Sequence, residues 1–429
     1  MAIVRPFRGV RYDQVRAGNL DDVVSPPYDV ITPDEQLAYR GKHPNNIVRL
    51  ILPKEEKIGG RCVDKYESAA IHLNEWLSTG VLIYDDENSI YICEQEYEIN
   101  GEWKKRLGFT CLVRLEDYES KTVLPHENIL AKPMDDRLNL MRSTNMNFDS
   151  VFGLYPSGHP EEIFKPFMMN PPDSVAVDSA GVICNLWRVS NPTAIDLIVS
   201  EMANQQILIA DGHHRYAAAL AYRNEMREKL GMVRADAPHE FVMMTLVSLE
   251  DSGLVVLPTH RLVSNIEDFY ATSFLSKLAE YFDVKESQRD QLAKAIETSE
   301  PGRHLFGLHM GKKSYVIELK STVSPEKVIE SPGSDALKRL DVSILHSLIL
   351  DKLLGIGTQS LSAQSNLSYK RDAADALDAV DKGDCLMAFL MNPTRVEEVK
   401  EVAAAGDKMP QKSTFFYPKL LTGLIMRVI

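Results

Sequence analysis

The sequence has few cysteines, and they lack the spacing of a metal or redox motif. Its 429 residues include 5 cysteines, and no two of them form a Cys-x-x-Cys pair. Most stand in apolar segments with the pattern of strands or helices, where a thiol behaves as a small hydrophobic group. We therefore expect the five to be reduced, buried and structural: Cys62, Cys93, Cys111, Cys184 and Cys385.

A long apolar run is also absent. No stretch reaches the roughly 20 apolar residues that a membrane-spanning helix needs. The beginning of the chain, Met1–Pro6, lacks the apolar core of a signal peptide. The sequence therefore predicts a cytoplasmic protein without a membrane partner.

The chain has no concentrated basic face. Its 48 Lys and Arg residues are outnumbered by 61 Asp and Glu residues, for a formal charge of −13. Duplex DNA binding depends on neutralising many phosphates, so we expect no specific nucleic acid partner. A single cation in a pocket still binds one phosphate group, because its charge acts within a Debye length of about 8 Å. The charge balance thus argues against DNA as a partner but is compatible with a bound nucleotide.

What is present is typical of a compact globular protein. The chain is 44% hydrophobic and 25% charged, and its length suffices for two or three domains with their own cores. Strand-like and helix-like segments alternate, which predicts a mixed α/β (α+β) protein of several domains. We expect an α/β domain with a hairpin over 1–115, a central domain over 116–263 and an α/β domain over 264–429.

Local signals predict individual elements. Thr32–Glu35 has the pattern of a capping box with proline at the first helical position. Asn100-Gly101 separates two strand-like runs and predicts a hairpin. We also expect a strand over Ile47–Leu52 and a long helix over Ala336–Leu354, because of their apolar patterns.

The most informative segment is an apolar run that leads into a helix across several polar residues. Ile207–Ala210 has the pattern of a buried strand, and apolar residues recur at helical spacing over His214–Leu230. A helix N-terminus attracts anions, Gly212 permits close approach, and Arg215 suits a phosphate group. The alternative is an ordinary turn with Asp211 as helix cap. His213 and His214 point about 100° apart on a helix, so a shared metal ion is a minor option.

This turn resembles a known phosphate-binding turn. Asp211, Gly212, His213 and Arg215 match the Asp-Gly-His-x-Arg form that free-serine kinases share with ParB-type partition proteins and sulfiredoxins. Sulfiredoxins have a reactive cysteine where this chain has His213. The resemblance implies a ParB/sulfiredoxin-like nucleotide-binding core without sulfur chemistry.

A second resemblance covers nearly the whole chain. Several separated blocks look like the bacterial and archaeal family labelled domain of unknown function 1015. The resemblance implies a cytoplasmic protein of about this length, with a serine-kinase activity suggested for some relatives. The blocks are Ser25–Ile31, His43–Asn46, Leu124–Glu127, Asp136–Leu138, Asp211–Arg215, Leu257–Arg261 and Met409–Lys419.

The segment Gly406–Thr414 superficially resembles a P-loop. Gln411 replaces the second glycine, and the segment follows a predicted helix instead of a strand, so we reject a Walker motif. Lys412, Ser413 and Thr414 are still candidate phosphate ligands. The alternative is a loop with a solvated lysine beside packed aromatic residues.

Further acid, base and anion-binding candidates follow strand-like segments or prolines. Glu127 follows Leu124-Pro125 at an expected strand end or loop, where a carboxylate is positioned to deprotonate a substrate hydroxyl, and Asp29 on the double-proline turn is another candidate. Asp135–Arg137 has the residues to hold a magnesium ion or to fix an arginine, but the acidic first turn of a helix is the more ordinary interpretation. The additional site candidates are Asp29, His126, Arg137, His260 and Arg261.

Together these patterns predict a nucleotide-dependent kinase of a small hydroxyl compound. We expect Gly212, His214 and Arg215 to hold the phosphates of ATP or ADP, with Mg²⁺ accompanying the nucleotide and Asp211 a possible metal ligand. The candidate catalytic residues are Asp211, Glu127 and His213. The resemblance to free-serine kinases implies L-serine as acceptor and O-phosphoserine as product. The alternatives are a ParB-like nucleotide-binding regulator and a binding protein for phosphate ligands without catalysis.

Overall fold

The chain folds into two compact units. The computed structural model describes residues 1–156, 160–297, 300, 302–357, 366–410 and 412–429. The first unit comprises Met1–Pro125, Ile129–Val255 and Pro418–Ile429, and the second comprises His126–Asn128 and Val256–Tyr417. The chain therefore leaves the first unit and later returns to it. The three domain ranges expected from the sequence remain predictions.

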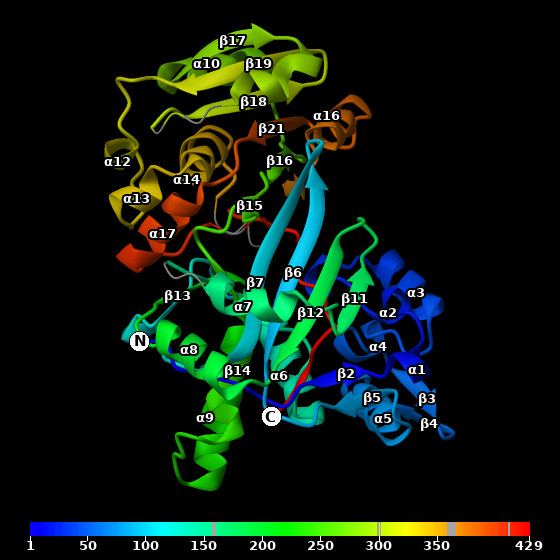
Figure 1. Ribbon diagram of the computed structural model, residues 1–429. Coiled ribbons are helices and arrows are strands. Elements are labelled where there is room, and N and C mark those ends of the chain that lie inside the picture. The colour runs from blue at the N-terminus through cyan, green and yellow to red at the C-terminus, as the bar shows by residue number, and fades with distance from the viewer. Residues whose placement is uncertain (157–159, 298–299, 301, 358–365, 411) are drawn as a thin grey trace. The chain divides into compact units, whose positions relative to one another are not determined.

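The first unit contains a nine-stranded mixed sheet within its described residues (Figure 1). The strand order is β11-β12-β6-β7-β14-β10-β13-β8, with β1 paired to β7. β10 runs parallel to β14, β13 runs parallel to β8, and the other pairs are antiparallel. The strands are β1 Val4–Arg5, β6 Ile90–Ile99, β7 Glu102–Arg114, β8 Val123–Leu124, β10 Val151–Tyr155, β11 Ser174–Val177, β12 Ile183–Val189, β13 Ile207–Asp211 and β14 Phe241–Ser248.

Helices and short strands complete this unit. Buried residues of α6 to α9 pack with the sheet in one hydrophobic core, which includes Phe164, Ile198 and Tyr216. The helices are α1 Gln14–Ala17, α2 Leu20–Val23, α3 Pro33–Lys42, α4 Val48–Ile51, α5 Lys65–Ser78, α6 Ala131–Thr144, α7 Pro160–Met168, α8 Pro192–Met202 and α9 His213–Leu230. The short strands form the pairs β2 Val10–Tyr12 with β5 Leu82–Tyr84, β3 Glu56–Ile58 with β4 Arg61–Val63, and β9 Met146–Asn147 with β23 Arg427–Val428.

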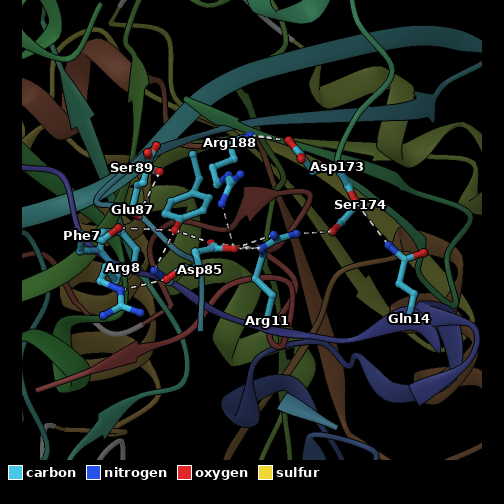
Figure 2. A network of polar contacts seen from close by, with 12 residues as sticks. Phe7, Arg8, Arg11, Gln14, Asp85, Glu87, Ser89, Asp173, Ser174 and Arg188 are labelled. Atoms are coloured by element: carbon cyan, nitrogen blue, oxygen red, sulfur yellow. Dashed lines mark hydrogen bonds and ion pairs between the residues drawn. The ribbon is translucent and has the colours of Figure 1, made fainter. Parts of the chain in front are cut away.

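A buried carboxylate joins three of these strands to the segment after β5. Asp85 accepts hydrogen bonds from Arg11 Nη2 at 2.6 Å and from the Tyr91 hydroxyl at 2.6 Å, and Arg188 lies 3.7 Å away (Figure 2). Burial, followed by the hydrogen bond to Asp85, raises the pKa of Tyr91, so its hydroxyl stays a donor at neutral pH. The network connects β2, β6 and β12 and fixes the N-terminal segment of the unit.

The second unit is built on a six-stranded antiparallel sheet, in the order β17-β19-β18-β21-β16-β20. The six strands of the sheet are β16 His260–Val263, β17 Phe282–Ser287, β18 Leu305–Met310, β19 Lys313–Leu319, β20 Leu367–Lys370 and β21 Met387–Met391. Two short strands outside it are β15 Val255–Val256 and β22 Phe416–Tyr417. Its helices are α10 Ala271–Tyr281, α11 Leu292–Ile296, α12 Pro325–Val328, α13 Asp335–Lys338, α14 Asp341–Ile344, a π-helix Leu345–Leu353, α16 Ala373–Asp381 and α17 Val396–Ala405. Across the described chain, no helix is long and apolar enough to cross a membrane.

Two local predictions are confirmed. Thr32 caps α3, and Glu35 returns a hydrogen bond to the Thr32 backbone N–H at 2.7 Å, which closes the capping box. β6 and β7 form the expected hairpin, with Asn100 at φ 53° and Gly101 at φ 80°. Both residues adopt the left-handed conformation that a tight two-residue turn requires.

Two other local predictions are wrong. Ile47–Leu52 contains the helix α4 Val48–Ile51 instead of a strand, and Val48, Leu50 and Ile51 are fully buried. Burial in the core outweighs the preference of β-branched residues for strands. The expected long helix over Ala336–Leu354 is divided into α13, α14 and the π-helix, and Leu340 separates the first two with extended backbone.

The cysteines are all free thiols, as expected. Burial raises the pKa of Cys93 to about 11 and that of Cys184 to about 12, so these thiols are protonated. Cys111, Cys184 and Cys385 are buried, Cys93 is half-buried and Cys62 is exposed on β4, which corrects the expectation that all five are buried. Cys62 belongs to the short β3–β4 pair, in which most residues are exposed or half-buried.

Candidate functional site

The polar turn after β13 has the conformation expected from its sequence. β13 ends at Asp211, and Gly212 precedes α9 with φ 89° and ψ 30°. A Cβ on Gly212 would lie 2.8 Å from Arg215 Nε, so both the backbone angle and the arginine require glycine here. Gly212, and not Asp211, is the helix cap, which leaves the carboxylate of Asp211 for other contacts.

Asp211 is held between two cations. Its Oδ2 accepts a hydrogen bond from Arg215 Nη2 at 2.5 Å, and its Oδ1 accepts one from Lys419 Nζ. Burial alone would raise the pKa of Asp211, but the Lys419 and Arg215 charges outweigh it and hold the pKa well below its usual range. Asp211 is therefore a permanent carboxylate that fixes both cations beside the helix N-terminus.

Arg215 connects this turn to the neighbouring strand. Besides Asp211, it donates to the backbone carbonyl of Ser150, just before β10. Its guanidinium is buried, and Nε has no hydrogen-bond partner. Burial alone would lower the pKa of Arg215, but the charges of Asp211, Asp149 and Asp29 outweigh burial and raise the pKa above its usual value. The side chain therefore stays cationic.

The two adjacent histidines have different environments. His213 is buried, and desolvation lowers its pKa to about 3 despite the nearby Asp211, so the ring is neutral at physiological pH. His214 is half-buried, and its Nε2 accepts a hydrogen bond from Leu130 N at 3.0 Å. Nowhere in the described residues do three or more His, Cys, Asp or Glu side chains gather as for a metal ion.

The first unit brings two more of the sequence blocks to this region. The guanidinium of Arg137 lies 4.0 Å from the ring centroid of Tyr28, and it pairs with Asp136 at 2.5 Å. Burial raises the pKa of Tyr28, with a further contribution from Asp29, while Arg137 and Arg215 oppose it. Asp29 itself is exposed next to this pair. The blocks at residues 25–31, 136–138 and 211–215 thus converge in one unit.

A small cavity of about 40 Å³ lies within this group. Its polar lining consists of Arg137, Asn147, Asp149 and Arg215, and apolar side chains complete it. Asp149 Oδ1 is buried and has no hydrogen-bond partner. A cavity of this size accommodates a few waters or one end of a small molecule, and it is too small for a nucleotide.

The remaining candidates belong to the second unit, where they form a cluster of their own around the loop before β22. Glu127 Oε1 accepts a hydrogen bond from Lys412 N at 3.2 Å. His126 Nε2 lies 3.0 Å from Thr414 Oγ1, and the His126 carbonyl accepts from Met409 N at 2.7 Å. Lys412 has a positive φ of 57° and an exposed side chain. Gln411 lies outside the described residues, and α17 precedes this loop, as the rejection of a P-loop assumed.

The polar residues at β16 in this unit have mainly structural contacts. His260 Nδ1 accepts a hydrogen bond from Met391 N at 3.1 Å, and burial lowers its pKa to about 4. Arg261 donates to the Lys412 carbonyl at 3.0 Å, and burial lowers its pKa to about 10. The Ser413 hydroxyl donates to the Pro410 carbonyl. The bonds made by Arg261 and Ser413 stabilise the loop that carries Lys412.

The sequence interpretation did not single out Lys419, Asp149, Tyr28 or Ser150 as site residues. Lys419 ends one block already noted and Tyr28 lies within another, so a charged or phenolic residue directly after a proline was the available signal. Asp149 and Ser150 carry no motif. Their proximity to Arg215 depends on strand pairing in the folded sheet.

Comparison with known proteins gives a family and distant structural similarity. The family described as "Protein of unknown function (DUF1015)" matches residues 4–343. A solved free serine kinase in complex with AMP has 16% identity and a TM-score of 0.35, covering 73% of this chain and 92% of that chain. A conserved hypothetical protein from Pyrococcus furiosus has 17% identity and a TM-score of 0.34, with 73% and 95% coverage. SbnI from Staphylococcus aureus has 10% identity and a TM-score of 0.35, with 73% and 85% coverage. No curated protein matches. Similarity of this extent identifies no activity.

Proposed function

The chain belongs to the DUF1015 family, and on that premise we propose that it is a phosphotransferase, a nucleotide-dependent kinase of a small hydroxyl compound. The acceptor is free L-serine and the product is O-phosphoserine. This acceptor is supported by the similarity of the Asp211–Arg215 turn to that of free-serine kinases. ATP or ADP is the phosphoryl donor.

The observation that carries the proposal is the charge arrangement at the start of α9. Asp211 holds Lys419 and Arg215 directly beside the helix N-terminus, so two cations face one carboxylate at the turn. The helix dipole adds the equivalent of about half a positive charge there. Backbone N–H groups of a first helical turn have no acceptor within the helix, which suits them to phosphate oxygens.

The two cations have distinct tasks in this mechanism. Arg215 is anchored on both Asp211 and the Ser150 carbonyl, so it supplies a fixed charge near the transferred group. Lys419 carries its ammonium group on a flexible four-carbon stem beside Asp211, so this charge can follow a phosphate as charge develops in the transfer. Asp211 positions both cations, and with both oxygens engaged it is poorly suited to accept a proton.

The residues fit a nucleotide phosphate better than they fit a dedicated metal site. Binding of Mg²⁺ by Asp211 would compete with Lys419 and Arg215 for its oxygens. Magnesium that enters with a nucleotide keeps water and phosphate oxygens as most of its ligands, and it neutralises phosphate charge when bound. The turn therefore needs no cluster of protein carboxylates.

Calorimetry and product analysis test this function. We would titrate ATP and ADP with and without Mg²⁺ into the wild type, the Arg215→Ala variant and the exposed control Arg142→Ala. We would then seek O-phosphoserine by ³¹P NMR after incubation with L-serine. Turnover that R215A loses and R142A retains supports the kinase. Nucleotide binding without turnover supports a non-catalytic binding protein, and absence of both overturns the proposal.

A further inference from the structure

Asp149 is an acidic residue beside Arg215 in the first unit, and one of its carboxylate oxygens accepts no hydrogen bond. It lies between β9 and β10, directly before Ser150, whose carbonyl accepts from Arg215. Oδ1 of Asp149 is buried without a hydrogen-bond partner and borders the 40 Å³ cavity. A buried acceptor without a partner costs free energy, so it is retained where a ligand completes it.

The other acids near this cavity are already engaged or exposed. Both oxygens of Asp211 pair with cations. Asp136 accepts from Lys65 at 2.5 Å and from Arg137 at 2.5 Å. Asp29 is exposed to solvent. Asp149 differs from these acids because it lines the cavity and its Oδ1 has no hydrogen-bond partner.

We propose that Asp149 is the catalytic base of the proposed phosphotransfer and that the cavity receives the hydroxyl end of the acceptor. This inference rests on the proposed function. The substrate oxygen attacks the terminal phosphorus of the nucleotide and its proton passes to Asp149 Oδ1. A new O–P bond forms while the bond from phosphorus to the bridging oxygen breaks. The electron pair of the broken bond leaves with the nucleotide, and the proton on Asp149 later passes to solvent.

The electrostatic surroundings suit this role. Burial raises the pKa of Asp149, and Asp29 raises it further. Arg215 of α9, Arg137 of α6 and the neighbouring Thr422 hydroxyl lower it, and the net effect is an increase. Tyr28, which also lies in this field, is neutral because burial raises its pKa. A base is more effective as its pKa approaches the working pH, which distinguishes Asp149 from the strongly acidic Asp211.

The size and lining of the cavity restrict the acceptor. The space is adequate for a hydroxymethyl group or a few waters, so a bulky sugar or peptide would not reach Asp149 Oδ1. Leu140, Met141 and Val242 form part of the wall and would exclude water from the reacting oxygen. The geometry therefore points to a small primary alcohol as the reacting group.

The test compares Asp149→Asn with Asp29→Asn and with Asp196→Asn, an exposed aspartate on α8. We would measure kcat and kcat/KM for L-serine against pH, and ADP affinity by calorimetry. We expect D149N to lower kcat by about 10²- to 10⁴-fold and to lose the decline in rate at acidic pH, while ADP still binds. D196N should match the wild type in all three quantities.

Several outcomes would overturn the assignment. If D149N retains the wild-type kcat or its acidic decline, Asp149 is not the base, and loss of that decline in D29N would assign the role to Asp29. If D149N does not fold, Asp149→Glu replaces it. This change moves the carboxylate by one methylene, so kcat should fall while the acidic decline is retained, and an unchanged kcat would overturn the proposal. A wild type without any phosphorylated product would overturn the kinase itself, whereas an active wild type with an unaffected D149N removes Asp149 alone.

Discussion

Lys419 and Asp211 form a buried ion pair although 208 positions separate them in the sequence. Their side chains are only 15% and 14% exposed, so water screens the pair weakly. The pair connects the segment that follows the second unit to the turn that begins α9. A residue far from the recognised turn therefore contacts the candidate site.

Loss of the Lys419 charge should weaken nucleotide binding. We expect Lys419→Met to reduce ADP affinity by about 1.5 to 3 kcal/mol, the range for a hydrogen bond to a charged group. Lys419→Arg should retain most of the affinity because it keeps the cation. Calorimetry with the exposed Lys229→Met as control checks this, and equal affinities of K419M and the wild type would remove Lys419 from the site.

Arg215→Ala should reduce ADP affinity by about as much as Lys419→Met does, and it should reduce the free energy of unfolding by more. The change leaves Asp211 Oδ2 and the Ser150 carbonyl without their donor. Breaking a buried ion pair by removing one partner costs about 3 to 5 kcal/mol. Urea unfolding would measure this loss, and a wild-type midpoint would show that the contact contributes little.

Gly212→Ala should destabilise the protein more than Gly231→Ala. Both glycines flank α9 with positive φ, 89° and 64°, so an alanine at either position costs about 1 to 2 kcal/mol of backbone strain. Only at Gly212 would the new Cβ meet the Arg215 guanidinium, whereas Gly231 has open space. We expect G212A also to lose ADP affinity. Equal unfolding free energies for the two variants would contradict the contact.

Asp136 should contribute to acid sensitivity. Burial raises its pKa, but Arg137 and Lys65 lower it to about 2, below the unfolded value of about 3.9. Because the folded pKa is the lower one, the stabilisation is complete above about pH 4 and is lost as pH falls toward 2. We expect Asp136→Asn to flatten the fall in unfolding free energy in this window. A variant with the wild-type pH dependence would exclude Asp136 as a source.

Duplex DNA should not bind specifically. The formal charge of −13 opposes association with a polyanion. Fluorescence anisotropy with labelled duplexes should give no saturable binding at physiological salt. Tight binding that weakens steeply with added salt would instead favour a ParB-like regulator.

Features specified by neighbouring residues could be predicted from the sequence. The capping box of α3, the Asn100-Gly101 turn and the junction at Gly212 each depend on a few consecutive residues. The helix α4 could not be predicted, because the burial of Val48, Leu50 and Ile51 decides its conformation. The π-helix is likewise a departure that apolar spacing does not reveal.

The candidate site shows the same difference between features set by neighbouring residues and features set by contacts between distant segments. Asp211, Gly212 and Arg215 were identified because strand, turn and helix are contiguous. The places of Asp149 and Lys419 depend on pairing between distant segments, which one sequence does not display. Glu127 and Lys412 do contact each other, but they do so within the second unit.

The division of the first unit's chain has a consequence for folding. In polymer terms, residues 256–417 form one very long loop between two segments that must meet. The entropy of closing a loop rises only logarithmically, by about 0.6 kcal/mol for each doubling of length. Insertions and deletions among those residues should therefore cost the first unit little stability. The folding rate of the first unit should nevertheless be slow, because contacts between segments far apart in the sequence form late. One such contact is the strand pair of Met146–Asn147 with Arg427–Val428, which forms only when these two remote segments meet.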